Sequence, residues 1–585
     1  MRPATKALLL LGGIAAIAIP AIAQVQNGTT ASPAPAISQP APTPQPQPSQ
    51  PQIPDVAQAG NVEVTNQLTV QAPPPPVEYP GFARRDPFVA GALDPSRMPI
   101  GADPWGQANG AFLSSLLRNM DTPIASRWAH IALRDGLLAS ARAPAGVNPV
   151  DWAAERAWLL LRMGEADAAR MIVASIDSDR FTPKMVQVAV QTALATSDPL
   201  GLCPLTGGMR KVEPRILPLA QAICAGLNGE PESAAAQVES ARRRGPIGGI
   251  DLTLAQKVVG ATADTGTAAT IEWEPVDALT SWRYGLATAT GMSPPERLLD
   301  KASPQLRAWY ARAPLIPAQD RLQSARIATG LGAFSSQALI DLYSWIYDST
   351  DPNELSSTDS WQLRLAFAGR DDETRLAAMR HLWGLNDDRL QLEASRALLG
   401  SAAARIKPSK ALQDDASQLI ASMLAAGLDS DAARWANAVR QMDDDQADKC
   451  WAMLALGAPD GAPIDVSVGR INSFIDRDKS KGKQRSALLV AGLVGLGRLS
   501  AQSASSLNSR HRLHIERSTR WTQMLDAAAR RHQSGTVLVL AGTGLQATDF
   551  DSLPPGHLFH IVMALRNTSQ QLAARMIAAE ALART

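Results

Sequence analysis

Residues 157–176 read AWLLLRMGEADAARMIVASI. An apolar stretch runs to Gly164, and an Ala-rich stretch with acidic residues at its start follows it. Gly ends helices well because it takes the left-handed backbone conformation that residues with a Cβ avoid. Acidic and hydroxyl side chains favour the first turn of the next helix, where they cap free N–H groups. The segment therefore predicts two antiparallel helices joined by a short turn.

The same pattern recurs along the chain, with AARMI present in both the first and the last copy. The other copies are AQAICAGLNGEPESAAAQVESA (220–241), IASMLAAGLDSDAARWANAV (420–439) and IVMALRNTSQQLAARMIAAEAL (561–582), the last with Asn567 in the position of the Gly. One hairpin cannot bury its apolar face alone, so neighbouring hairpins must stack. We therefore predict an all-α fold over residues 110–585, an α-solenoid of stacked antiparallel helix hairpins.

These hairpins resemble tetratricopeptide and Sel1-like repeats. The shared features are the Gly at the end of the first helix and the small residue that opens the second, namely Gly164, Gly229 and Gly427 with Ala168, Ala234 and Ala432. The period is irregular, and most of the consensus Trp, Tyr and Pro positions are absent. The resemblance implies a solenoid that binds proteins or peptides on a concave face, and it implies no catalytic residues.

Composition agrees with packed helices and argues against a polyanionic partner. Hydrophobic residues make up 45% of the 585 residues, and aromatic residues only 5%. β-Sandwiches need more β-branched and aromatic residues than this chain has. Lys plus Arg number 56 against 55 Asp plus Glu, a net charge of +1. Nucleic-acid binding normally requires a basic excess, and none is present.

The N-terminal region predicts export. Residues 1–23 contain Arg2 and Lys6, then an apolar run too short to span a bilayer, and an Ala-x-Ala end, which is the pattern of a cleaved signal peptide. We expect a periplasmic protein, or one secreted from the cell. Residues 24–80 are rich in Pro and Gln and predict a disordered arm, and residues 81–109 predict an irregular lead-in to the helices.

The chain as a whole is similar to exported proteins of uncharacterised function from alphaproteobacteria. The features that carry this resemblance are the signal, the Pro/Ala-rich arm and DWAAERAWLLLRMGEADAARMIV (151–173). Some of these proteins carry the label antifreeze glycopeptide polyprotein. Such a polypeptide is a long Ala-Ala-Thr repeat, which here only ATADTGTAAT (261–270) approaches.

Three cysteines occur, at Cys203, Cys224 and Cys450. In an oxidising compartment two of them can pair. Cys203 and Cys224 are close in sequence, so we predict a disulfide between them that ties a loop to the next helix; two buried thiols are the alternative. Cys450 has no His nearby in sequence, and we interpret it as a buried free thiol.

Two motifs suggest ligands at first sight. VLVLAGTGLQATD (537–549) contains the Gly-x-Gly of a dinucleotide-binding turn, but Pro554 and Pro555 stop the helix that such a site requires. We therefore predict a buried Gly-rich helix and no cofactor. The pairs His511/His514 and His557/His560 have the i, i+3 spacing of residues on one helix face, but neither pair brings the third ligand that zinc needs. We predict no metal site.

The remaining polar runs have structural interpretations. The acidic runs at 371–373, 387–388 and 443–445 stand at breaks between helices, where they would cap helix N-termini. The basic stretch 510–520 is interpreted as a solvated helix face, with anion binding as the alternative. Most tryptophans are expected to be interhelix anchors, and a few could hold a peptide or glycan; those in helical stretches are Trp128, Trp152, Trp158, Trp282, Trp309, Trp345, Trp361, Trp383, Trp435, Trp451 and Trp521.

These observations favour a non-catalytic scaffold or adaptor that binds envelope proteins or peptides through the repeat surface. The alternative is a peptidoglycan-binding or cell-wall turnover accessory related to the helical superhelix of murein lyases. A lyase would need a catalytic Glu-Ser pair in a Gly-rich lysozyme-like core. The pair in GEPES (229–233) stands instead in a turn between helices. We predict no catalytic residues.

Overall fold

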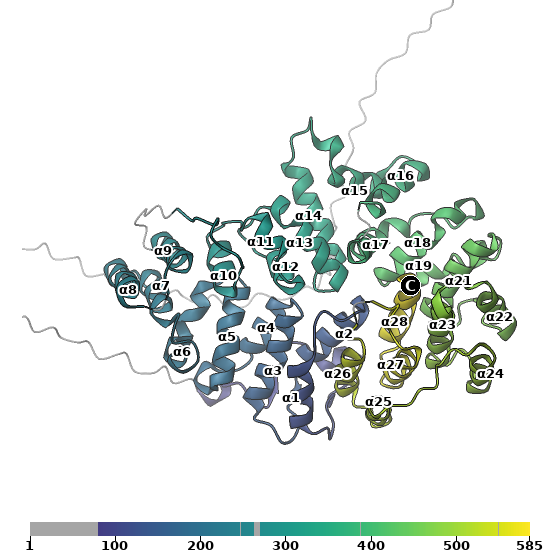
Figure 1. The fold of residues 1–585 in the computed structure, drawn as a ribbon, viewed down its shortest axis with the longest axis horizontal. Coiled ribbons are helices and arrows are strands. Elements are labelled where there is room, and N and C mark those ends of the chain that lie inside the picture. The colour runs from purple at the N-terminus through teal and green to yellow at the C-terminus, as the bar shows by residue number, and fades with distance from the viewer. Residues whose placement is uncertain (1–79, 246, 263–269, 386–387, 548) are drawn as a thin grey trace, which may run out of the picture. The chain divides into compact units, whose positions relative to one another are not determined.

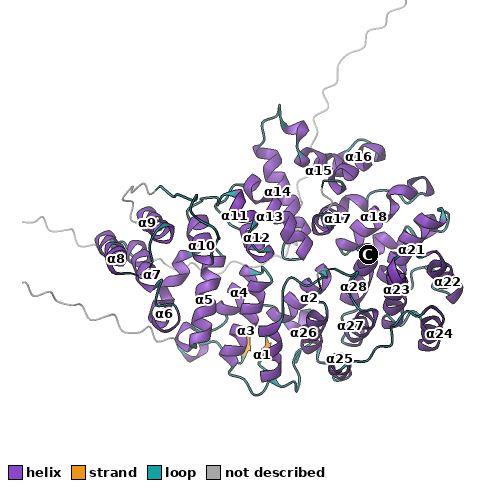
Figure 2. Cartoon of the chain, viewed as in Figure 1, coloured by secondary structure: helices purple, strands orange, loops and turns teal. Residues whose placement is uncertain are grey.

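The computed structural model describes residues 80–585, apart from residues 246, 263–269, 386–387 and 548. The predicted signal peptide and residues 24–79 of the predicted arm lie outside the described residues, as does most of the 261–270 segment. Helices make up most of the described chain, and Figure 2 shows strand only at one small pair. The predicted all-α helical-repeat fold is confirmed.

The helices follow one another with short connections. The first half contains α1 (Gly110–Asn119), α2 (Arg127–Leu138), α3 (Pro149–Arg162), α4 (Ala166–Ala174), α5 (Pro183–Ala195), α6 (Thr206–Val212), α7 (Leu217–Leu227), α8 (Pro231–Arg244), α9 (Ile250–Thr262), α10 (Ser281–Ala289), α11 (Glu296–Asp300), α12 (Pro304–Tyr310), α13 (Ala318–Leu331) and α14 (Ser336–Ser349). The second half contains α15 (Asp359–Ala368), α16 (Asp372–Trp383), α17 (Arg389–Ala403), α18 (Gln413–Ala425), α19 (Asp429–Ala433), α20 (Ala436–Val439), α21 (Asp444–Gly457), α22 (Val468–Arg477), α23 (Gln484–Gly495), α24 (Ala501–His511), α25 (Arg520–Arg530), α26 (Ser534–Gly544), α27 (Pro555–Asn567) and α28 (Gln571–Ala583).

The α3–α4 hairpin shows how the sequence builds one unit. Asn148 caps α3 by accepting hydrogen bonds from the two N–H groups of Val150 and Asp151. The helix ends at Arg162, and Gly164, two residues later, has a φ of 86°. The Gly164 N–H then bonds Leu161 O at 3.0 Å, and the next N–H reaches back five residues at 2.8 Å. This is the Schellman arrangement, which satisfies the last carbonyl groups of a helix.

The same two hydrogen bonds recur at eight turns within the described residues. In each, a residue with positive φ donates its N–H three residues back, and its successor donates five residues back. These residues are Gly164, Ser197, Gly229, Gly291, Gly427, Gly497, His532 and Ser569. The repeat is therefore a turn of constant geometry between helices of variable length, which explains the irregular period.

Two predicted details of the turns are wrong. Asn567 does not hold the left-handed position of the last hairpin, since it is the last residue of α27 and Ser569, with a φ of 65°, ends the helix instead. Counting back from AARMI places Ser569 level with Gly164. The predicted caps are also missing, because the residues immediately before α4, α8, α19 and α28 make no side-chain cap hydrogen bond. The Schellman turn brings the chain into the second helix without one.

Residues 81–109 pack onto the helices, although they contain no α-helix. The strand β1 (Val89–Ala90) pairs antiparallel with β2 (Ala141–Arg142). Trp105 is 1% exposed and packs edge-on against Trp152, with the two ring centres 5.0 Å apart. The Pro104 carbonyl accepts a hydrogen bond of 2.8 Å from the N–H of Gly535 in α26. The lead-in therefore joins the first helices to a helix near the C-terminus.

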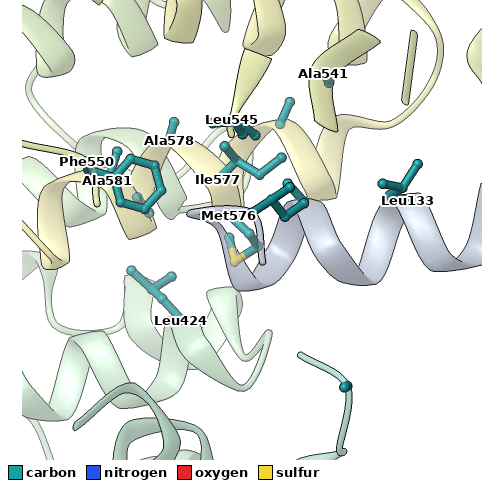
Figure 3. Close-up of a cluster of buried hydrophobic side chains, with 14 of the residues drawn as sticks. Leu133, Leu424, Ala541, Leu545, Phe550, Met576, Ile577, Ala578 and Ala581 are labelled. Atoms are coloured by element: carbon teal, nitrogen blue, oxygen red, sulfur yellow. The ribbon is translucent and has the colours of Figure 1, made fainter. Parts of the chain in front are cut away.

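The last helices pack directly against the first ones. Figure 1 shows α26 and α28, in yellow, beside the purple α2. In the close-up of Figure 3, the α28 side chains Ile577 and Ala578 belong to the same buried cluster as Leu133 of α2 and Leu424 of α18. Helix α28 also contacts α21, α23 and α27. The hairpins therefore do not form a ribbon with two free ends, since the C-terminal helices fill the space beside α2.

A second, smaller apolar core lies apart from the main one. It is formed by α5 to α10, with Val190, Leu219 and Ile223 fully or almost fully buried. Cys203 and Cys224 lie in this region, and their sulfur atoms are bonded at 2.07 Å, joining the 3-10 segment Pro199–Leu205 to α7. Among the described residues, no helix is long and apolar enough to cross a membrane.

Candidate functional site

The segment with the Gly-x-Gly motif is a helix. Residues Ser534–Gly544 form α26, whose first nine residues are all buried. A Cβ on Gly544 would lie 2.2 Å from Trp521, and one on Gly542 would lie 3.0 Å from Leu133. The glycines are therefore required for close helix packing, as predicted, and the strand and turn of a dinucleotide site are not formed here.

The two histidine pairs differ from each other. His511 is the last residue of α24, whereas His514 lies in the following loop with a φ of 57°, so the predicted common helix face does not exist. His557 and His560 do share α27. The His560 ring bonds Asp526 at 2.8 Å, and the His557 ring lies 4.5 Å from that of Trp521. Within the described part of the chain, no group of three His, Cys, Asp or Glu side chains could hold a metal ion.

Other sequence candidates have structural roles. Asp371 and Asp388 cap α16 and α17 through hydrogen bonds to Thr374 N and Gln391 N, so the capping interpretation is confirmed for these two. Asp443 precedes α21 without a side-chain cap bond. Cys450 is fully buried, and burial raises the pKa of its thiol to about 12. A thiol of that pKa remains protonated and unreactive at neutral pH.

Most of the basic stretch 510–520, namely residues 512–519, is a loop between α24 and α25 and not the predicted helix face. Arg512 and His514 both have positive φ, which turns the chain sharply. Arg510, Arg512 and Arg517 are exposed.

A buried carboxylate in α28 joins this helix to the N-terminus of α2. Glu580, whose side chain is 2% exposed, accepts hydrogen bonds from Ser126 Oγ at 2.6 Å and from the N–H groups of Arg127 and Trp128. It also accepts one from Arg584 at 2.6 Å. Because the N-terminus of a helix carries free N–H groups and a partial positive charge, this carboxylate caps α2.

Arg127 extends this contact to the middle of the chain. Its Nε donates to Thr329 O at 2.9 Å and its Nη1 donates to Ala425 O at 2.7 Å. These carbonyls belong to the last turns of α13 and α18, where helices have unpaired acceptors. Glu393 and Arg396 lie in the same buried group. We call Arg127, Glu393, Arg396, Glu580 and Arg584 the closure cluster.

A cleft of about 400 Å³ lies next to the closure cluster. Its walls come from parts of the chain that are far apart in sequence, namely residues 121–125, Leu331, residues 388–390, residues 546–547 and 549–550, and Arg584. Phe550 is fully buried, and the Arg584 guanidinium lies 5.5 Å from its ring centre. The cleft exists only because the chain closes, so no local sequence pattern could predict it.

The outer face of α14 carries an exposed tryptophan. Trp345 is 58% exposed, although Trp side chains are usually buried. The guanidinium of Arg321 in α13 lies 5.8 Å from its ring centre, within cation–π range. Among the tryptophans that were predicted to lie in helices, only Trp345 is exposed in the described part of the chain.

A second aromatic group lies on the other side of α14. Tyr347 stacks on Trp361 of α15, with ring centres 6.3 Å apart and planes within 9°. Arg364 lies 5.1 Å from the Tyr347 ring centre. Tyr347 and Trp345 are two residues apart and therefore point to opposite sides of the helix. The pair Arg321 and Trp345 and the group Tyr347, Trp361 and Arg364 are therefore separate patches on either side of α14. We call the two patches together the aromatic surface; Figure 1 shows α13, α14 and α15 as neighbours.

The aromatic surface is the candidate binding site, and the sequence indicated it only in part. The excess of Trp over Tyr suggested that some Trp side chains are available to a partner. Which Trp side chain is exposed depends on which side of each helix faces a neighbour. No protein-family model matches this chain, and no curated protein or solved structure is significantly similar to it.

Proposed function

We propose that this protein is a non-catalytic scaffold or adaptor that binds protein or peptide partners in the cell envelope through its helical-repeat surface. The observation that carries the proposal is the aromatic surface on α13, α14 and α15. Trp, Tyr and Arg are the residue types that contribute most to binding energy at protein interfaces. An exposed Trp with an Arg over its ring provides a large apolar contact at a small entropic cost.

The compartment follows from the sequence. Residues 1–23 have the pattern of a cleaved signal peptide, so we place the mature protein in the periplasm, with secretion as the alternative. The disulfide between Cys203 and Cys224 is compatible with an oxidising compartment. The partner is accordingly sought among proteins and peptides of the envelope.

The test compares three immobilised proteins in the same envelope extract: the natural protein, Trp345→Ser, and Leu200→Ser. Leu200 is 57% exposed, so its replacement changes the surface to a similar degree at a site away from the aromatic surface. Bound proteins are identified by mass spectrometry, and the affinity of each is then measured with purified components. Removing a hot-spot Trp should weaken binding by roughly 30-fold, about 2 kcal/mol.

Retention of the partner by Leu200→Ser and its loss from Trp345→Ser would support the proposal. Equal binding to all three proteins, or no specific partner for any, would contradict it. Incubation with purified peptidoglycan tests the other function class in parallel. Release of muropeptides would identify an enzyme, and co-sedimentation alone would identify a glycan-binding protein.

A further inference from the structure

A cleft of about 350 Å³ lies between α20, α21 and α22. Its apolar lining residues include Val439, Met442 and Leu454. The ring of Trp451 forms one wall, with its indole N–H bonded to Asp465 O at 2.7 Å. This volume falls within the range of sites that bind small molecules or single residues of a peptide.

Three arginines line the cleft, against the two carboxylates of Asp444 and Asp465. Arg470 and Arg477 both bond a third carboxylate, Asp448, at 2.6–2.8 Å, and this contact joins α21 to α22. Arg477 also lies 3.5 Å from Asp444. Asp448 and Asp444 therefore balance much of the charge of Arg470 and Arg477.

Two guanidinium groups keep unused hydrogen-bonding capacity. Arg440 bonds only to neutral oxygens in the described part of the chain, those of Ala436, Asn437 and Pro463. Arg470 lies 4.0 Å from the Trp451 ring centre, and its buried Nη1 has no hydrogen-bond partner among the described residues. A buried N–H without an acceptor is unfavourable, so an acceptor that reaches it stabilises the site.

We propose that this cleft binds a carboxylate that is carried next to an apolar side chain, as at the C-terminus of a peptide that ends in Leu or Val. The carboxylate of the ligand bonds Arg440 and Arg470, and the apolar side chain of the ligand packs against Met442 and Leu454. Arg pairs well with carboxylates because its planar N–H groups match both oxygens. The site uses residues other than the aromatic surface and stands independently of the function proposed above.

The experiment is isothermal titration calorimetry of the purified protein with three probes. These are acetyl-Ala-Ala-Leu with a free C-terminus, the same peptide as the C-terminal amide, and 4-methylpentanoate. Binding is repeated with Arg440→Gln, and with Arg434→Gln as the matched control. Arg434 is an exposed arginine of the same region that pairs with Asp431 and does not line the cleft.

We expect the free-acid peptide to bind and the amide to bind at least about tenfold more weakly, because the amide lacks the charge that Arg440 and Arg470 recognise. Arg440→Gln should weaken binding of the acid by a similar factor and leave the amide unchanged, whereas Arg434→Gln should change neither. Equal binding of 4-methylpentanoate and the peptide acid would support the same chemistry and assign the site to a small acid. Equal binding of acid and amide, no effect of Arg440→Gln, or no binding of either carboxylate probe at millimolar concentration would overturn the proposal.

Discussion

At the scale of single residues, buried charged side chains have roles that the local sequence does not predict. Glu165 stands at the start of α4, where the pattern predicts a helix cap. Its side chain, 2% exposed, instead turns to His130 at 3.1 Å and to Arg312 at 3.3 Å. Burial alone would raise its pKa, but the hydrogen bond from His130 and the charges of Arg312, His130 and Arg134 outweigh burial and lower it.

This shift predicts a pH dependence of stability. Because the folded protein binds the Glu165 proton less tightly than the unfolded chain does, Glu165 stabilises the fold at pH values above its ordinary pKa of about 4.3. The contribution is lost as pH falls from that value through the lowered folded pKa. At pH 7, Glu165→Gln should reduce the free energy of unfolding by about 3 kcal/mol, since it leaves the buried cations without their partner.

Urea unfolding measured from pH 7 down to pH 3 checks this expectation. The difference between the natural protein and Glu165→Gln should shrink as pH decreases. The exposed Glu354→Gln serves as a control and should follow the natural protein throughout. A difference that stays constant with pH would show that the Glu165 charge does not contribute.

At the scale of elements, the Schellman turn between helices is the repeating unit. At the eight Schellman turns of the described chain, five of the residues with positive φ are Gly, and the others are Ser197, His532 and Ser569. Sequence inspection detects the turns that contain Gly and misses those that do not. A non-Gly residue at positive φ costs about 1–2 kcal/mol, so these positions are maintained by the packing of the two helices on either side.

Substituting two of these glycines distinguishes the energetic cost of backbone strain from the cost of overpacking. Gly164 and Gly229 have similar φ values, 86° and 79°. A Cβ on Gly164 would lie 2.6 Å from the Cβ of Ala308, whereas one on Gly229 meets nothing within 4 Å. Gly229→Ala should therefore cost only the left-handed strain, about 1 kcal/mol. Gly164→Ala should cost that and a further 1–3 kcal/mol or so from overpacking.

Equilibrium unfolding of both variants measures this difference directly. The prediction fails if the two substitutions destabilise equally, because Ala308 of α12 would then not restrict residue 164 in the turn between α3 and α4. Substitution of Gly207, which has an ordinary φ and open space around it, gives the baseline for a Gly→Ala change without strain.

At the scale of the whole molecule, closure of the chain decides what is buried. Ser126 and Glu580 are 454 residues apart in sequence and 2.6 Å apart in the structure. Arg127 joins both to the ends of α13 and α18. A buried ion group of this kind adds little net stability compared with apolar packing, but the loss of one member is costly. We infer that the closure cluster selects which helix ends meet.

Glu580→Gln tests that inference. It removes a negative charge from a buried group that contains three arginines, and we expect a loss of about 3–5 kcal/mol in the free energy of unfolding. Hydrogen exchange should show the loss first in α2 and α28, which the carboxylate joins. Glu373→Gln, at a residue whose side chain is 76% exposed, should change stability by less than about 0.5 kcal/mol. A Glu580 variant as stable as this control would contradict the assigned role.

The sequence by itself determined that this chain forms helices, that Gly and small residues punctuate them, and that hairpins must stack. These properties depend on residues within about five positions of one another, so local rules capture them. Only the tertiary structure decided that α28 packs beside α2, that Glu580 caps that helix, and that Trp345 remains exposed while Trp152 and Trp435 are buried. The physical reason is that each helix has several apolar sides, and which of them meets a neighbour depends on residues hundreds of positions away.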